Sequence, residues 1–404
     1  MNDINEKVFG PDSGKIVEMC QAGLESVFWR QDKYGTGGIV ESDERVDEGR
    51  KLYWPWCWPR SYIVEPLLVA GEHERVRDFL GFWMKCQRAE GNWLHCYDVR
   101  NYNEYPGLPE TDNVGYMLWH IGSYIKASND TKWLNENWAG IEKSVSFLEK
   151  NFNEELDLIW GQEEANIPGE GRFPVRYALH INSICAKGLL SASAMAALKG
   201  DARSAKRWDD MAGRILKTGI GTKLWDEEAG AFAFGFTEDK RRITSPALWL
   251  TLNPFWMHEC FDDKIEAVLD YHKEQLYDKD PQIKGTYWVY NHSPLLGPGK
   301  QLENEYSGIG VWVGGLPVLI HALLKAGRHG EASEQLKKVI ELTNPENKLV
   351  PEHVNTMHRG KLGNYSVYPE PYYYVDSGNL LHLSFFLSLI GWRMPGLLEM
   401  PRKQ

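Results

Sequence analysis

The chain has 404 residues, of which 43% are hydrophobic and 25% are charged, so it can bury a large apolar core. Its formal net charge of -11 argues against nucleic acid or an anionic membrane as a partner, because both need a basic face. The 17 Trp and 19 Tyr residues stand out. Aromatic rings stack on sugars, although on count alone core packing is their more frequent use.

The first ten residues are charged and lack the apolar stretch of a signal peptide. No uninterrupted apolar run reaches the ~18 residues that a membrane span needs. The six cysteines are scattered without a Cys-x-x-Cys pair, which favours reduced thiols. We therefore expect a cytoplasmic protein with no membrane partner.

Apolar periodicity predicts twelve helices. In chain order they are expected at 12–30, 60–70, 72–88, 110–128, 131–152, 175–199, 201–219, 246–258, 261–277, 309–326, 330–342 and 375–391. Several odd-numbered helices carry one charged face, and the seventh begins after Asp201, a favourable N-cap. The even-numbered helices are apolar nearly all round, so they must be surrounded by protein.

The connections alternate in length as well. Those from even to odd helices are very short: Gly71, Asn129-Asp130, Gly200 and 327–329. Those from odd to even helices take roughly 20 to 30 residues, which is rare in a compact domain unless the loop has a function. This pattern predicts an all-α, (α/α)6 toroid of six outer–inner helical hairpins, in one domain spanning 1–404. All the long loops would then share one face.

Aromatic and acidic side chains are concentrated in those long loops. They include Trp54 to Arg60, Trp93, Trp160, Trp225 to Glu228, Trp288, Glu303 to Tyr306 and Glu352. Solvated loops normally favour Gly, Pro, Asn, Asp and Ser instead. The composition therefore indicates a pocket for a polar, ring-shaped ligand such as an oligosaccharide.

Cleavage of a glycosidic bond needs one protonated carboxyl and a second carboxylate that activates water or attacks carbon. Glu163 and Glu164 follow Trp160 in a setting that could keep one of them protonated. The alternative for this pair, and for Glu352, is a helix cap or a solvated acidic loop. His353 and His358 lack a metal-ligand spacing, and no Gly-rich phosphate loop follows a strand. We expect neither a metal nor a cofactor. His180, inside an apolar helix, is more simply a core histidine than a catalytic one.

Four motifs in order resemble the glucoamylase-like family, glycoside hydrolase family 15, from about Tyr53 to Trp392. They are Trp58-Pro59-Arg60, the run from Glu110 to Trp119, Trp160 with Glu163-Glu164, and Leu349 to His353 followed by Lys361 to Tyr365. The resemblance implies an inverting, exo-acting hydrolase of α-linked oligosaccharides. Glu163 or Glu164 would be its general acid and Glu352 its general base.

Substrate contacts are expected from the same motifs and loops: Trp56, Trp58, Arg60, Ser61, Trp93, Asp112, Trp160, Trp288, Glu305 and His353. Ser61 stands where the family has an Asp that contacts the non-reducing-end sugar. Gly161-Gln162 separates Trp160 from the two glutamates, which leaves the choice of acid open. Two other functions also stay open: an N-acylglucosamine epimerase-like isomerase, and a non-catalytic oligosaccharide-binding toroid. The sequence does not indicate an oligomeric state.

Overall fold

The computed structural model describes residues 15, 56–57, 59, 64–69, 71–95, 97–98, 109–161, 175–244, 246, 248–279, 284–287, 311–342 and 353–354. The helices predicted at 12–30 (apart from Lys15) and at 375–391 lie outside these residues. The described part of the chain is mostly helical, as the periodicity predicts.

The other ten predicted helices are present, although several boundaries differ by four residues or more. They are α3 (Val64–Val69), α4 (His73–Cys86), α5 (Thr111–Ser128), α6 (Thr131–Lys150), α7 (Leu179–Leu198), α8 (Ala202–Arg214), α9 (Leu248–Met257), α10 (Ile265–Leu276), α12 (Leu316–Lys325) and α13 (His329–Leu342). A π-helical stretch, Ile215–Lys223, continues α8, and a 3₁₀ stretch, Glu259–Lys264, precedes α10.

Two predicted helices begin too early. The segment Val175–Ala178 is a strand, β7, and Val311–Trp312 is a strand, β12, followed by a 3₁₀ turn at Val313–Gly315. Both stretches are short apolar runs, which periodicity alone does not assign to helix or strand. Strand β7 leads directly into α7, and β12 leads into α12 through the 3₁₀ turn.

The short connections are tight because one residue in each adopts a left-handed backbone. Gly71, Gly200 and Gly327 have φ of 83°, 80° and 76°, and Asn129 has φ of 56°. Each follows a helix, where a left-handed residue ends the helix and turns the chain. Two of the next helices are then capped: Asp130 accepts from Trp133 N at 3.0 Å, and Asp201 from Ser204 N at 3.0 Å.

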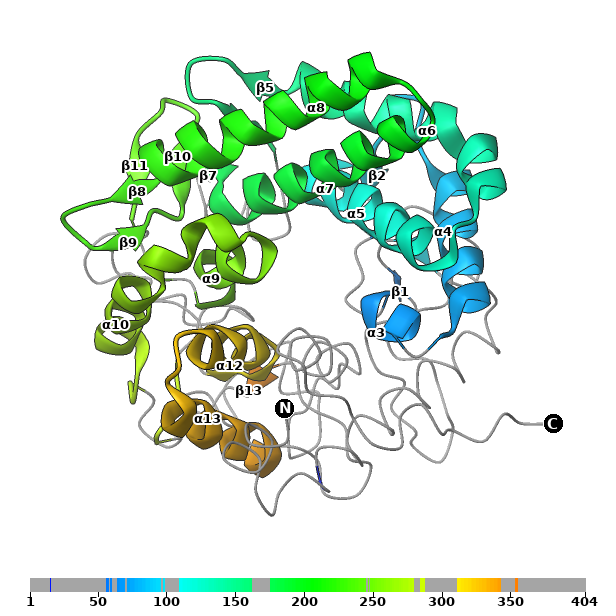
Figure 1. Cartoon of the computed structure of the whole chain (residues 1–404). Coiled ribbons are helices and arrows are strands. Elements are labelled where there is room, and N and C mark those ends of the chain that lie inside the picture. The colour runs from blue at the N-terminus through cyan, green and yellow to red at the C-terminus, as the bar shows by residue number, and fades with distance from the viewer. Residues whose placement is uncertain are drawn as a thin grey trace.

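Figure 1 shows the described helices in two concentric arcs. Helices α3, α5, α7, α9 and α12 lie inside, and α4, α6, α8, α10 and α13 lie outside. Burial agrees with this arrangement, since α12 buries all its residues from Leu316 to Leu324 whereas α13 buries only one stripe. The alternation of apolar and amphipathic helices thus separates the two layers.

Among the described helices, α7 is the one long and apolar enough to cross a membrane. It nevertheless packs against α5, α8 and α9, and most of it is buried inside the protein. Its apolar surface belongs to a cluster of buried side chains that runs from Val64 to Val339. Helix α7 is therefore a core helix in this fold.

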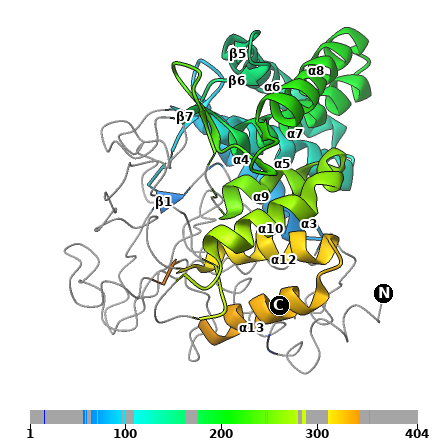
Figure 2. The same cartoon turned by 90° about the vertical axis from the view of Figure 1, so that its left-hand side faces the viewer.

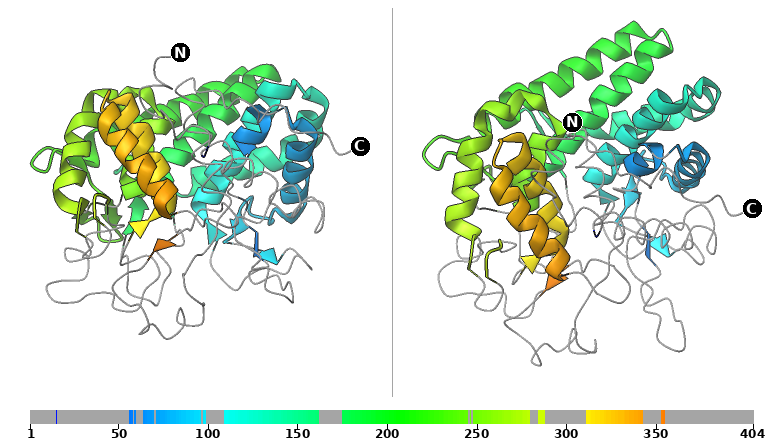
Figure 3. Two further views of the ribbon diagram at one scale, coloured as in Figure 1. Left: turned by 90° about the horizontal axis from the view of Figure 1, so that it is seen from below. Right: turned by 60° about the horizontal axis from the view of Figure 1, so that its bottom comes forward.

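Short antiparallel strands gather at one end of the helices (Figures 2 and 3). The pairs are β1 (Trp56–Cys57) with β3 (Tyr97–Asp98), β2 (Trp93–Leu94) with β4 (Pro109–Glu110), β5 (Phe152–Asn153) with β6 (Leu158–Ile159), β8 (Trp225–Asp226) with β9 (Ala231–Phe232), and β12 with β13 (His353–Val354). A three-stranded sheet has the order β11 (Arg242–Ile243), β10 (Gly235–Thr237), β7.

Three buried histidines make the fold sensitive to acid. Burial lowers the pKa of His258 and of His321 to about 3 and that of His272 to about 4. They are therefore neutral when folded, but the unfolded chain binds their protons below about pH 6.5. Their contribution to stability is present above that pH and is lost as the pH falls from 6.5 toward 4.

We expect the melting temperature to fall steeply over that window, with about 2 kcal/mol lost per histidine at about pH 5. Thermal unfolding followed by circular dichroism at a series of pH values measures it. His272, held between Thr251 Oγ1 and the Val268 carbonyl at 2.7 Å each, provides the control. A His272→Gln variant should show a shallower dependence, and an unchanged slope would contradict this explanation.

Candidate functional site

Strands lead into three of the inner helices at the same end of the molecule. Strand β4 leads into α5, β7 into α7, and β12, through its 3₁₀ turn, into α12. The described short strand pairs lie beside the N-termini of these helices (Figure 3). This end, which we call the loop face, is where the sequence places its candidate residues.

The segment that precedes Glu163 and Glu164 is fixed against the start of α5. Trp160 N donates to the Asn151 carbonyl and Gly161 N to the Arg176 carbonyl, both at 2.8 Å. A Cβ on Gly161 would lie 2.5 Å from the side chain of Thr111, so only glycine fits this approach. Gly161, which seemed an interruption in the sequence, is required by the contact with α5.

A buried polar cluster lies at the N-terminus of α5. His95 Nδ1 is 2.9 Å from Glu110 Oε1, and the Asn113 amide donates to Glu110 Oε2 at 3.3 Å and to the Leu94 carbonyl at 3.0 Å. Glu110 is 3% exposed, so its carboxylate is held by these side chains rather than by solvent. A helix N-terminus also favours negative charge, which suits this position.

The first turns of α5 and α7 meet through a second pair. Asp112 Oδ2 lies 3.7 Å from His180 Nε2, and both side chains are buried. His180 is therefore buried in the core, as the apolar helix predicts, and its ring lies close to a carboxylate. The pair joins two neighbouring inner helices just below the loop face.

Between the inner helices, two tryptophan rings pack together with a lysine. Trp119 of α5 and Trp256 of α9 have ring centroids 5.3 Å apart. Lys187 Nζ lies 5.4 Å and 5.9 Å from these two centroids and donates to the Met257 carbonyl at 3.1 Å. Burial lowers the pKa of Lys187. This contact ties α7 to the C-terminal end of α9.

Three predicted site residues have described side chains. Trp160 is half-buried at the loop face, and its indole donates to Glu238 Oε2 at 2.7 Å. Trp93, expected as a pocket wall, is fully buried and donates its indole N–H to the Trp83 carbonyl at 2.8 Å. Its ring packs in the core, and it is not among the sugar contacts that we propose. Asp112 is also fully buried, and its contact with a sugar hydroxyl stays a prediction.

For two further residues the structure describes the backbone. Trp56 lies in β1 opposite Asp98, and His353 lies in β13 opposite Trp312. The remaining predicted residues lie outside the described residues: Glu163, Glu164, Glu352, Trp58, Arg60, Ser61, Trp288 and Glu305. Within the described ranges, no group of three or more His, Cys, Asp or Glu side chains could hold a metal ion.

Sequence reasoning did not name His95, Glu110 or Glu238 as site residues, although the first two lie in one of the long loops. His95 and Glu110 come together because β2 pairs with β4, and two-residue strands give almost no sequence signal. Glu238 reaches Trp160 from 78 positions away. For the first two, position within a long loop next to a predicted inner helix is a signal that could have found them.

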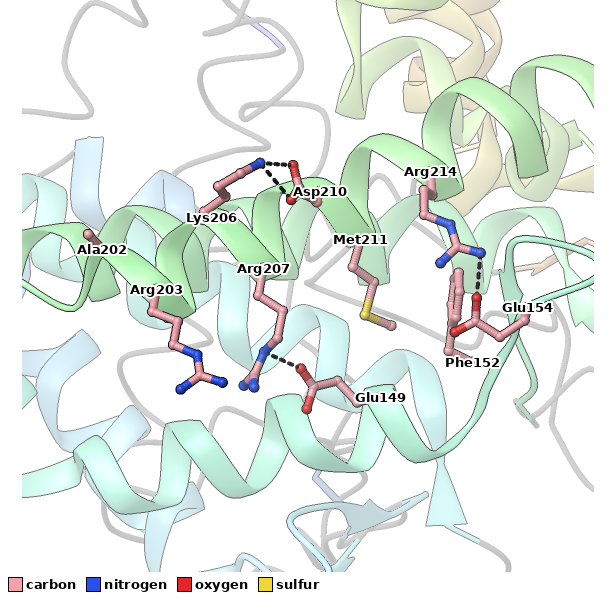
Figure 4. A pocket seen from close by; sticks show the side chains of 10 residues that line it. All are labelled: Glu149, Phe152, Glu154, Ala202, Arg203, Lys206, Arg207, Asp210, Met211 and Arg214. Carbon is pink, nitrogen blue, oxygen red and sulfur yellow. Dashed lines mark hydrogen bonds and ion pairs between the residues drawn. The ribbon is translucent and has the colours of Figure 1, made fainter.

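A separate groove of about 740 Å³ lies on the outer side, between α6 and α8 (Figure 4). Its cations mostly face carboxylates of the same groove: Arg207 with Glu149 at 3.0 Å, Lys206 with Asp210 at 2.8 Å, and Arg214 with Glu154 at 2.6 Å. The opposite charges in the groove therefore largely neutralise one another. The groove is formed mainly by two outer helices, whereas the loop face lies at the N-termini of the inner helices. We do not assign it to the candidate site.

The protein is mostly helical, and it resembles carbohydrate-cleaving enzymes in the comparisons that follow. No family model matches the sequence. An uncharacterized glycosyl hydrolase of Methanocaldococcus jannaschii is 25% identical over 289 residues, which are 69% of this chain and 44% of that protein. The chain thus spans less than half the length of this curated relative.

Several solved structures share this fold, and three of them have names that refer to sugars. A glycosidase variant in complex with glucose superposes with a TM-score of 0.66 at 14% identity, covering 94% of this chain and 98% of that one. A Streptococcus pneumoniae structure from a family of metal-independent α-mannosidases, bound non-productively to α-1,6-mannobiose, gives 0.64 at 11%, covering 97% of both. A sugar epimerase from a ruminal bacterium gives 0.59 at 12%, covering 94% and 99%.

Proposed function

We propose that this protein is an inverting, exo-acting glycoside hydrolase of α-linked oligosaccharides, similar to glucoamylase. The proposal rests on the position of the described residues next to the candidate carboxylates, which lie near the N-terminal ends of inner helices. Gly161, two residues before Glu163, abuts Thr111 at the start of α5, and His353, next to Glu352, pairs with the strand that leads into α12. Glu163 therefore follows, and Glu352 precedes, a described residue whose backbone lies at the loop face. The similarity to glycosidases in sequence and fold supports the same reaction class.

In the proposed reaction, Glu163 (or Glu164) donates a proton to the glycosidic oxygen. Glu352 removes a proton from a water molecule that attacks the anomeric carbon from the opposite side. An inverting mechanism requires the two carboxyl groups to stand roughly 6.5–9.5 Å apart, which leaves room for that water. No cofactor enters these steps, because the protons and the nucleophile come from side chains and water.

The proposed substrate contacts follow from position along the loops. Trp56, Trp58, Trp160 and Trp288 would stack against sugar rings, and Arg60, Ser61, Glu305 and His353 would contact hydroxyl groups. Asp112, on the first turn of α5, would orient the ring of His180 on the first turn of α7. Ser61, shorter than the Asp of the resembled family, would leave space beside the non-reducing-end sugar.

The proposed architecture is a closed (α/α)6 toroid that forms one domain over 1–404. It rests on the two concentric arcs and on the alternation of short and long connections (Figure 1). The helices expected at 12–30 and 375–391 would close the ring. All six long connections would then surround the proposed site.

The test is a panel of α-linked disaccharides with products followed by anomer-resolved proton NMR. Inversion predicts that the β-anomer of the released sugar appears first and then mutarotates. Early release of the α-anomer would exclude the inverting mechanism. Binding without any product after long incubation would favour a non-catalytic oligosaccharide-binding protein.

One observation favours an N-acylglucosamine epimerase-like isomerase as a second candidate. His95 and His180 both lie at the N-terminus of an inner helix or beside it, each near a carboxylate. A sugar epimerase also shares the fold. The same NMR experiment separates the two functions, because epimerisation yields no new reducing end.

A further inference from the structure

Trp160 is held by a carboxylate from a distant hairpin. The Trp160 indole N–H donates to Glu238 Oε2 at 2.7 Å, although the two residues are 78 positions apart. Glu238 follows β10 and lies in the turn that leads to β11. It is exposed, so its contact with Trp160 is not forced by burial. A hydrogen bond to an ionised acceptor is also stronger than one between neutral groups.

The turn that carries Glu238 has a defined shape. Lys240 N donates to the Thr237 carbonyl and Thr237 N to the Arg241 carbonyl, both at 3.0 Å. Lys240 adopts a left-handed backbone with φ of 61°. Thr237 Oγ1 also contacts Asp239, which fixes the other side of the turn. Glu238 is therefore presented from a rigid hairpin rather than from a free loop.

The same turn makes a second contact with the region around Trp160. Lys240 forms an ion pair with Glu155, in the β5–β6 hairpin that leads directly to Trp160. The β10–β11 turn thus braces that hairpin at two points, through Glu155 and through Trp160. Together with the backbone bonds of Trp160 and Gly161, these contacts fix where the chain leaves β6.

We propose that Glu238 is a positioning residue for the proposed general acid. By fixing the Trp160 ring, it holds the segment that ends at Gly161, two residues before Glu163. This inference rests on the proposed function and adds to it a residue that contacts neither the sugar nor the reacting atoms. Glu238 acts only through Trp160.

A positioning role predicts a specific pattern of kinetics. Removal of the carboxylate in Glu238→Ala frees the Trp160 ring, and the displaced acid should lower kcat by about 10- to 100-fold with a smaller change in KM. Glu238→Gln keeps an oxygen that accepts from the indole, so its kcat should stay within about 3-fold of the wild type. Glu142→Ala, which removes an exposed carboxylate on the outer helix α6, is the matched control and should leave kcat unchanged.

The decisive arm repeats Glu238→Ala in a Trp160→Phe background. Phenylalanine has no indole N–H, so removal of Glu238 should cause no further loss of kcat there. An undiminished loss in this background would overturn the proposal, because Glu238 would then act by another route. Wild-type kcat in Glu238→Ala would overturn it as well.

Amide hydrogen exchange provides a readout that does not depend on activity. The Trp160 and Gly161 amides, bonded to the Asn151 and Arg176 carbonyls, should exchange faster in Glu238→Ala and normally in Glu238→Gln. Unchanged exchange in Glu238→Ala would show that Glu238 does not fix this segment. If the wild type cleaves no sugar, the proposed function fails, whereas the exchange rates still decide whether Glu238 holds Trp160.

Discussion

Replacement of Glu352 by glutamine is expected to reduce hydrolysis of an α-linked disaccharide by about 10²- to 10⁴-fold. Glutamine has nearly the same shape as glutamate, but its amide cannot take a proton from the attacking water. Oligosaccharide binding should stay close to that of the wild type, because the contacts to the sugar rings are unchanged. Turnover is measured from the release of reducing sugar, and affinity from calorimetry on the same variant.

The matched control is Glu334→Gln, on the exposed side of the outer helix α13. It removes the same charge far from the loop face and should leave turnover unchanged. If Glu352→Gln hydrolyses the disaccharide at the wild-type rate, Glu352 is not the base, and the proposed mechanism loses one of its two carboxylates.

The contact between α5 and α7 should be highly sensitive to the addition of a single methyl group. A Cβ on Gly115 would lie 2.8 Å from the Cys185 backbone nitrogen, and one on Gly188 would lie 2.6 Å from the Gly115 carbonyl oxygen. Both clashes are with backbone, which cannot move aside as a flexible side chain can. We expect Gly115→Ala to lower the free energy of unfolding by on the order of 3 kcal/mol.

Gly213→Ala in α8 is the control, because a Cβ there meets nothing within 4 Å. Alanine is the better helix former, so this variant should be more stable than the wild type by about 0.5–1 kcal/mol. Chemical denaturation of both variants measures the difference. Equal stability of the two alanine variants would contradict the close packing of α5 on α7. Because Asp112 and His180 lie on the first turns of these helices, the Gly115 variant should also lose activity.

The sequence by itself determined the helices and their two layers. Apolar residues all round α12 and along one stripe of α13 are local patterns with the helical period, so they can be recognised without knowledge of the fold. The tight turns were equally readable, since Gly71, Gly200, Gly327 and Asn129 are residue types that tolerate a left-handed backbone. The resemblance to carbohydrate-cleaving enzymes, drawn from motifs in the loops, agrees with the glycosidases that share the fold.

Only the tertiary structure decided which of the loop residues meet. Trp93 has the same composition signal as Trp160, yet one ring fills the core and the other lies half-buried beside Glu238. The pairs formed by Asp112 with His180 and by His95 with Glu110 depend on helix packing and on two-residue strands. The physical reason is that periodicity is a local property. It reports only how one segment divides its surface between core and solvent. A contact between segments depends on the path of all the chain between them.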